Sequence, residues 1–127
     1  SMNIFDGQTA AGTMRLNDTA LPLTPGWAEK VVTAGAEKLL AGVRPEDITL
    51  TAEPEEGAVP VTVQYHEDYG SRVGYYFTIN GEEVISIMRD DVLQGCRQAY
   101  WKPNPRALHF FDAATERNIG YPEEAAE

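Results

Sequence analysis

The sequence predicts an all-β barrel or sandwich, and three observations carry that prediction. Between residues 59 and 88, apolar and polar residues alternate with a period of two, which is typical of half-buried strands. Asn80-Gly81 interrupts this stretch, and a type I′ hairpin favours Asn-Gly because both central residues need positive φ. Turn-forming residues also recur along the chain at about the 8–12-residue spacing of small β proteins.

Short strands are expected before this region. Residues 13–16 and 20–23 are candidates, and Pro22 would place the second strand at a sheet edge because proline cannot donate to a ladder. Residues 39–43 form an apolar run that predicts a strand ending in the proline turn of residues 44–47. Within the alternating region, the side chains expected to face the interior are those of Val59, Val61, Val63, Tyr65, Val73, Tyr75, Phe77 and Ile79.

One short helix is expected after the second of these strands. Thr24 offers a hydroxyl cap, and Pro25 suits the first helical position. Trp27 and Val31, four residues apart, would share one face, and Gly35 would end the helix.

The C-terminal third predicts two more strands, at residues 99–101 and 108–111, separated by the Pro-Asn-Pro of residues 103–105. A one-turn helix could follow Asp90-Asp91. The acidic, alanine-rich residues from Pro122 onward are expected to fray.

The length and charge of the chain limit the range of functions that it could have. The chain has 127 residues, which fits one domain, and its formal net charge is −10. This charge disfavours nucleic acid and anionic lipid, because binding to polyanions depends on neutralising phosphates with Lys and Arg. No apolar run approaches the roughly 20 residues of a membrane-spanning helix, and no signal peptide is expected at the start.

Cys96 is the single cysteine, so it forms neither an internal disulfide nor a cysteine-based zinc site. We expect a reducing compartment and a buried, inert thiol, with a reactive thiol as the alternative.

The residues offer little catalytic chemistry. No P-loop, no dinucleotide-binding glycine pattern and no Gly-x-Ser-x-Gly elbow is present. His66-Glu67-Asp68 could bind a metal or supply an acid–base pair, but adjacent strand residues point to opposite faces, which favours a solvated strand end. His109 lies beside two phenylalanines, so a core or interface role is favoured over that of a ligand or base.

Aromatic residues suggest one binding hypothesis. A stacking platform for sugars or bases could be built from Tyr75, Tyr76, Tyr100 and Trp101. Their alternation with apolar residues favours core packing instead.

Three segments carry recognisable motifs in a fixed order. The first, at 41–48, reads AGVRPEDI and fits the pattern G-[IV]-R-P-E-[DH]-[LI]. The second, at 63–71, reads VQYHEDYGS, and the third, at 108–115, reads LHFFDAAT, which is close to H-L-F-D-x-x-T-G. Together with MNIF at 2–5 and ALPL at 20–23, they resemble the region that follows the nucleotide-binding domain in ABC importer ATPase subunits of the maltose and glycerol-3-phosphate type.

The resemblance implies a transport-associated OB (TOBE) domain. Its fold would be an OB-like barrel of short antiparallel strands, with a β extension and at most one or two short helices. Ser1 would be an artificial addition, residues 2–121 the domain and residues 122–127 a frayed tail. Within the domain, residues 2–40 would form the β extension and residues 41–119 the signature-bearing barrel.

By the same resemblance, the chain would be a non-catalytic accessory, regulatory and dimerisation domain of a sugar or sugar-phosphate importer's ATPase subunit. It would lie in the cytoplasm, at the inner face of the plasma membrane. No cofactor is expected in this chain, since ATP and Mg would bind the nucleotide-binding domain of the parent. The implied partners are that domain, a second ATPase subunit, the permease subunits indirectly and a regulatory protein. Nucleic acid and direct membrane insertion are not expected.

The resemblance also singles out a set of interface residues: Arg44, Pro45, Glu46, Asp47, Gly70, Ser71, His109, Phe111 and Asp112. Arg44 could pair with Glu46 or with a carboxylate of a partner, because its guanidinium fork suits bidentate pairing. Two other hypotheses stay open. One is a stand-alone OB-type module for a sugar or oxyanion, and the other is a small enzyme that uses His66 and Glu67.

Overall fold

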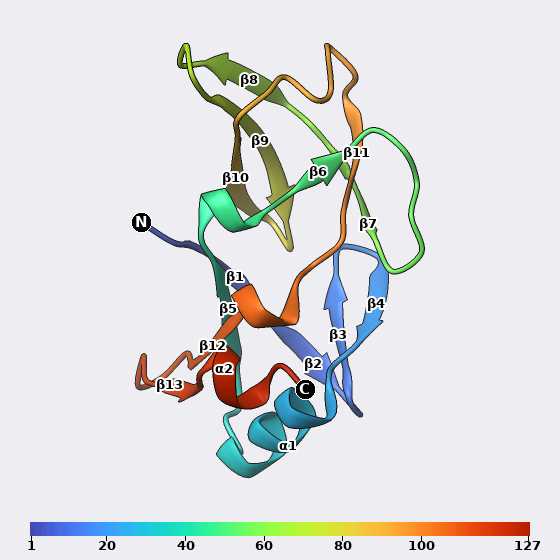
Figure 1. The fold of residues 1–127 in the computed structure, drawn as a ribbon. Coiled ribbons are helices and arrows are strands. Elements are labelled where there is room, and N and C mark those ends of the chain that lie inside the picture. The colour runs from blue at the N-terminus through green and yellow to red at the C-terminus, as the bar shows by residue number, and fades with distance from the viewer.

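The computed structural model describes residues 1–127, which fold into thirteen short strands, two α-helices and two 3-10 turns (Figure 1). The elements of the N-terminal half are β1 (Asn3–Asp6), β2 (Gln8–Ala10), β3 (Thr13–Leu16), β4 (Thr19–Pro22), α1 (Pro25–Ala34), β5 (Leu39–Val43), η1 (Pro45–Asp47), β6 (Leu50–Thr51) and β7 (Val59–Thr62). Those of the C-terminal half are β8 (Tyr65–Asp68), β9 (Val73–Ile79), β10 (Glu82–Met88), β11 (Gln98–Trp101), η2 (Pro105–Ala107), β12 (His109–Asp112), β13 (Asn118–Gly120) and α2 (Pro122–Ala125).

The strands form four antiparallel sheets. Their strand orders are β1-β5-β12-β13, β10-β9-β8, β6-β11-β7 and β2-β3-β4. Figure 1 shows the second and third sheets in the upper part of the molecule, with α1, α2, β12 and β13 below them. The predicted all-β, OB-like fold class is confirmed.

The hairpin at Asn80-Gly81 is confirmed. Strands β9 and β10 pair from Ile79↔Glu82 to Val73↔Met88. Asn80 has φ of 50° and Gly81 has φ of 85°, so both turn residues occupy the left-handed region that a type I′ turn requires.

Helix α1 begins and ends where the sequence predicts. The Thr24 hydroxyl accepts a hydrogen bond from the Trp27 backbone N–H at 3.2 Å, and Pro25 follows the cap. Gly35 ends the helix in the left-handed conformation. Trp27 is fully buried and packs edge-on against Phe110, with ring centroids 4.8 Å apart.

Proline placement also follows the prediction. Pro22 is the last residue of β4, which lies at the edge of its sheet. Pro45 opens η1 directly after β5. The strands expected at 99–101 and 108–111 appear as β11 and β12, within one residue of their predicted bounds.

One hydrophobic core joins the N- and C-terminal parts. A cluster of 22 buried residues extends from Phe5 to Ala125, and within it Phe5 meets Trp101 edge-on, with ring centroids 6.2 Å apart. Strand β1 pairs with β5, and β5 pairs with β12. Because these hydrogen bonds join residues 3–6 to the signature-bearing part, residue 40 does not separate two independently packed pieces.

The C-terminal tail is not frayed, contrary to the prediction. Residues 122–125 form α2, in which Pro122 and Ala125 are buried. The Thr24 hydroxyl donates to the Ala125 carbonyl at 2.7 Å, and the Gly26 N–H donates to the Glu127 carbonyl at 2.8 Å. The tail is ordered because the first turn of α1 satisfies its carbonyl groups.

Two smaller expectations are also wrong. No helix follows Asp91; its carboxylate instead accepts a hydrogen bond from the Gln94 N–H at 3.0 Å and holds a turn. Cys96 is exposed rather than buried, because the turn at Gln94-Gly95, with both residues at positive φ, carries it to the surface.

Candidate interaction surface

The signature Arg44-Pro45-Glu46-Asp47 forms the corner between β5 and β6. The Asp47 N–H donates to the Arg44 carbonyl at 2.9 Å, which closes the 3-10 turn. The next residue, Ile48, is buried, and its carbonyl accepts a hydrogen bond from the fully buried Ser86 hydroxyl at 2.6 Å. The corner is therefore tied to β10 in the core.

Arg44 is exposed at this corner, and of the two pairings considered for it, the one with Glu46 does not form. The ion pairs of the structure join Lys30 to Glu124, Lys102 to Glu55 and Arg106 to Glu127. The Arg44 charge is thus available to a group outside the chain or to a neighbour on the same surface.

That neighbour is His109. Strand β12 pairs with β5 so that His109 lies opposite Gly42, and Ile4 of β1 lies opposite the same glycine. The His109 ring stacks on Phe111 with centroids 6.4 Å apart and an interplanar angle of 17°. Partial burial lowers the pKa of His109, and the positive charge of Arg44 lowers it further, against the opposing carboxylates of Glu123 and Asp47.

Gly42 allows the side chains of Met2, Ile4 and Phe111 to pack closely over it. A Cβ at position 42 would lie 2.5 Å from Met2 Sδ, 3.0 Å from Phe111 Cε2 and 3.2 Å from Ile4 Cδ1. Ile4 is 40% exposed, while Met2 and Phe111 are half-buried. We call this outward surface the β5–β12 face, made up of Met2, Ile4, Gly42, His109 and Phe111.

The remaining signature residues lie elsewhere or shape turns. Gly70 and Ser71 lie in the turn between β8 and β9, at the top of Figure 1 and away from β12. Gly70 has φ of 89°, and its N–H donates to the Asp68 carboxylate at 2.8 Å. Asp112 accepts hydrogen bonds from the backbone N–H groups of Ala114 and Thr115, at 2.8 and 3.4 Å. Gly70 and Asp112 therefore stabilise turns.

The core packing that the sequence favours for Tyr75, Tyr76, Tyr100 and Trp101 is confirmed at two of the four positions. Tyr75 and Trp101 are almost completely buried, and Tyr75 donates its hydroxyl hydrogen to the Asp91 carboxylate at 2.5 Å. Burial raises the pKa of Tyr75 to about 12, and the hydrogen bond to Asp91 adds to this shift. Tyr76, one residue further along β9, faces outward with Tyr65 rather than with Tyr75.

The position of Tyr65 explains why its stacking on Tyr76 was not predicted from the sequence. The alternation from Val59 to Val63 predicts that Tyr65 faces the interior, yet it is 46% exposed. The chain passes from one sheet to another at residues 63–64: the Val63 N–H donates to the Arg97 carbonyl, and the Gln64 N–H donates to the Tyr76 carbonyl. This crossing breaks the inward–outward alternation.

His66 and Glu67 do not form a joint site. His66 lies opposite Tyr75 and Glu67 lies opposite Gly74, at consecutive positions that face opposite sides of β8. The structure contains no group of three or more His, Cys, Asp or Glu side chains placed to hold a metal.

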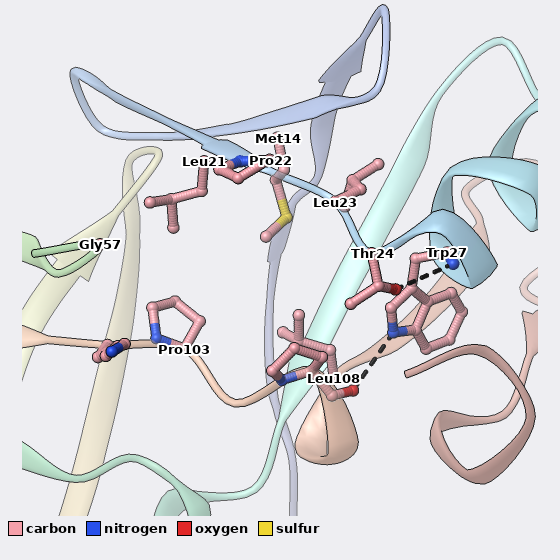
Figure 2. A pocket seen from close by; sticks show the side chains of 11 residues that line it. Met14, Leu21, Pro22, Leu23, Thr24, Trp27, Gly57, Pro103 and Leu108 are labelled. Carbon is pink, nitrogen blue, oxygen red and sulfur yellow. Dashed lines mark hydrogen bonds between the residues drawn. The ribbon is translucent and has the colours of Figure 1, made fainter. Parts of the chain in front are cut away.

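The pocket of Figure 2 is mostly apolar. Its volume is about 170 Å³, and it lies between β4, the start of α1 and the segment that precedes β12. Figure 2 shows Met14, Leu21, Leu23 and Pro103 around it. The Trp27 Nε1–H donates to the Pro105 carbonyl at 3.3 Å, and the Thr24 hydroxyl accepts from Trp27 N–H, so these polar groups already have partners within the chain.

The four antiparallel sheets, the β5–η1 corner and the closing β12 strand define a small OB-like β domain. Residues 41–99 of the chain match the family model of the TOBE domain.

Two relatives extend the similarity beyond residues 41–99. The chain is 34% identical over 123 residues to the sn-glycerol-3-phosphate import ATP-binding protein UgpC of Paracoccus denitrificans, across 94% of this chain and 32% of that protein. It is 31% identical over 124 residues to an uncharacterized ABC transporter ATP-binding protein of Sinorhizobium fredii, across 94% of this chain and 31% of that protein. The chain therefore spans about a third of the length of these curated relatives. Neither helix of the structure is long or apolar enough to cross a bilayer.

Proposed function

We propose that this chain is the accessory and dimerisation domain of an ATP-binding subunit of an ABC importer for sugars or sugar phosphates. The observation that carries the proposal is the β5–β12 face. There the Arg44–Asp47 corner and the closing strand meet around a half-exposed apolar patch. Both relatives are named as ATP-binding proteins, which supports the same role.

The proposed mechanism needs no chemistry within the chain. ATP and Mg would bind in a nucleotide-binding domain outside these residues, and the subunit would act in the cytoplasm beside its permease. An accessory domain changes the activity of such an assembly only if it makes different contacts in the open and closed states. The β5–β12 face suits this role because apolar contact at Ile4 and Phe111 can combine with the charge of Arg44.

The size of the native protein tests the proposal. An antibody raised against this chain should detect, in the source cells, a protein far larger than 14.0 kDa that is enriched with membranes. A soluble band near 14.0 kDa would contradict the accessory role and favour a stand-alone binding module.

Self-association of the chain tests the dimerisation part separately. Sedimentation velocity should show a monomer–dimer equilibrium that Ile4→Glu weakens by at least about tenfold, because a carboxylate would be buried in an apolar contact. Val32→Glu is the matched control, since Val32 is 81% exposed on α1, away from this face. Equal association of both variants, or a monomer at every soluble concentration, would contradict dimerisation through the β5–β12 face.

A further inference from the structure

A second surface, on the outer side of the β10-β9-β8 sheet, carries an ordered group of tyrosines. Tyr65 lies opposite Tyr76, and Tyr76 lies opposite Ile85, so the three side chains form one row across the sheet. Because Tyr75 and Phe77 point into the core, Tyr76 and its row point outward. We call this surface the tyrosine face, made up of Tyr65, Glu67, Tyr69, Tyr76 and Glu83.

The aromatic rings of the tyrosine face hold each other in place. Tyr65 stacks on Tyr76 with centroids 4.3 Å apart and an interplanar angle of 13°. The hydroxyls of Tyr69 and Tyr76 are hydrogen-bonded at 3.0 Å. Gly74 makes room for the third ring, because a Cβ there would lie 3.0 Å from Tyr69 Cε2. A partner would therefore meet pre-ordered rings, which reduces the entropy lost on binding.

The rings nevertheless remain open to solvent. Tyr65 is 46% exposed and Tyr69 is 49% exposed, and tyrosine is enriched at protein–protein interfaces. Since one side of the Tyr65 ring is covered by Tyr76, its other side is the surface available for stacking.

The charge around these rings is negative and unpaired. Strands β8, β9 and β10 contain Glu67, Asp68, Glu82 and Glu83 but no lysine or arginine. None of these four carboxylates takes part in an ion pair of the structure. Partial desolvation and the nearby carboxylates of Glu83 and Glu67 raise the pKa of Tyr65, which supports the proximity of both glutamates to its ring.

We propose that the tyrosine face binds an arginine-bearing segment of a partner polypeptide. The guanidinium plane would stack on the open side of Tyr65, and its N–H groups would donate to Glu67 and Glu83. Arginine fits better than lysine because its planar fork combines stacking with directed hydrogen bonds to carboxylates. The formal net charge of −10 favours a basic segment over an anionic one.

This inference does not depend on the role proposed for the β5–β12 face. The two surfaces use different strands, β1, β5 and β12 for the first and β8, β9 and β10 for the second, so each can be varied separately. Failure of the arginine experiment would therefore leave the accessory role standing, and a soluble 14.0 kDa native protein would leave the tyrosine face standing.

Nuclear magnetic resonance titration of the ¹⁵N-labelled chain tests the proposal with three blocked tripeptides. The probes are glycine–arginine–glycine, its lysine counterpart and its citrulline counterpart, which keeps the shape of arginine without the charge. We expect the arginine peptide to shift the backbone amides of Tyr65, Tyr76 and Glu83 saturably. The lysine peptide should bind more weakly, and the citrulline peptide should not shift these amides.

Four variants give matched comparisons. Tyr65→Leu should weaken binding of the arginine peptide by about three- to tenfold, because it removes the stacking surface. The double variant Glu67→Gln, Glu83→Gln should weaken it at least as much and keeps both side-chain shapes. The controls are Glu82→Gln, which removes a neighbouring charge, and Tyr121→Leu, which removes a tyrosine that is 48% exposed elsewhere; both should bind normally.

Three results would overturn the proposal. The first is shifts spread evenly over the acidic surface. The second is undiminished binding by the double glutamine variant. The third is a response of the same amides to methyl glucoside but not to the arginine peptide, which would indicate a sugar as the occupant.

Discussion

Asn17 and Asn80 hold each other through a reciprocal pair of hydrogen bonds. The Asn17 backbone N–H donates to Asn80 Oδ1 at 2.8 Å, and the Asn80 backbone N–H donates to Asn17 Oδ1 at 3.0 Å. Both residues have positive φ, 54° and 50°, at the tips of two turns that lie 63 positions apart in the sequence. The Asn80 amide also donates to the carbonyls of Asp6 and Arg15, at 2.7 and 3.0 Å. This contact joins the β2-β3-β4 sheet to the β9–β10 hairpin.

Removing the Asn80 amide should destabilise the fold without preventing the hairpin. Asn80→Gly keeps a residue that tolerates positive φ but loses the side-chain hydrogen bonds, so the free energy of unfolding should fall by about 1–3 kcal/mol. Asn80→Ala should cost more, since it adds backbone strain. Urea unfolding followed by tryptophan fluorescence measures both. Asn118→Gly, at an exposed strand position, is the control, and a loss of stability no larger than that of the control would show that the contact contributes little.

Ser86 should be needed for the stability of the signature corner. Ser86→Ala removes the donor of the 2.6 Å hydrogen bond and leaves the Ile48 carbonyl without that partner in the core. The expected loss is about 1–2 kcal/mol in the free energy of unfolding. Ser71→Ala changes an exposed serine and should stay close to wild type. If the two variants prove equally stable, the Ser86 hydrogen bond does not stabilise the corner.

The contact between α1 and the C-terminal residues depends on Gly26. A Cβ at this position would lie 2.8 Å from the Ala125 carbonyl carbon and 2.9 Å from its Cα, so Gly26→Ala requires a backbone shift. We expect α2 to detach while the β sheets persist, with faster hydrogen exchange at residues 124–126. Glu29→Ala, at an exposed position of the same helix, should leave this exchange unchanged. Protected tail amides in Gly26→Ala would mean that the close packing is not required.

His109 should make stability depend on pH. Its pKa in the folded state is lowered by burial and by Arg44, below the ordinary value of about 6.5. The unfolded chain then binds a proton more readily than the folded chain, so this contribution to stability is complete above the ordinary pKa. It is lost as the pH falls from about 6.5 toward the folded-state pKa. His109→Gln should flatten this part of the stability curve.

The cause of that shift can be tested directly. A titration of the His109 ring by nuclear magnetic resonance should give a pKa below the ordinary value, and Arg44→Gln should raise it. Arg72→Gln, in the β8–β9 turn, removes the same charge outside the β5–β12 face and should leave the titration unchanged. A pKa of His109 that does not respond to Arg44→Gln would contradict their proximity.

The sequence predicted some residues of the candidate surface but not how they come together. The motif residues Arg44, His109 and Phe111 were recognisable as a set, but their meeting depends on the pairing of β12 with β5. That pairing joins segments more than sixty residues apart, and no local pattern specifies it. The same limit applies to the Arg44–Glu46 pair, one of two pairings open to the Arg44 guanidinium, which is absent from the structure.

The sequence by itself determined the local structure: the cap at Thr24, the hairpin at Asn80-Gly81, the edge position of Pro22 and the all-β class. Each follows from the hydrogen-bonding and φ preferences of a few adjacent residues, so no distant contact is needed to predict it. Only the tertiary structure decided that Tyr65 faces solvent and that the tail forms α2. These outcomes depend on which surface another segment covers. The change of sheet at residues 63–64 turns the Tyr65 side chain toward solvent. The first turn of α1 supplies the hydrogen-bond donors that the tail carbonyls need.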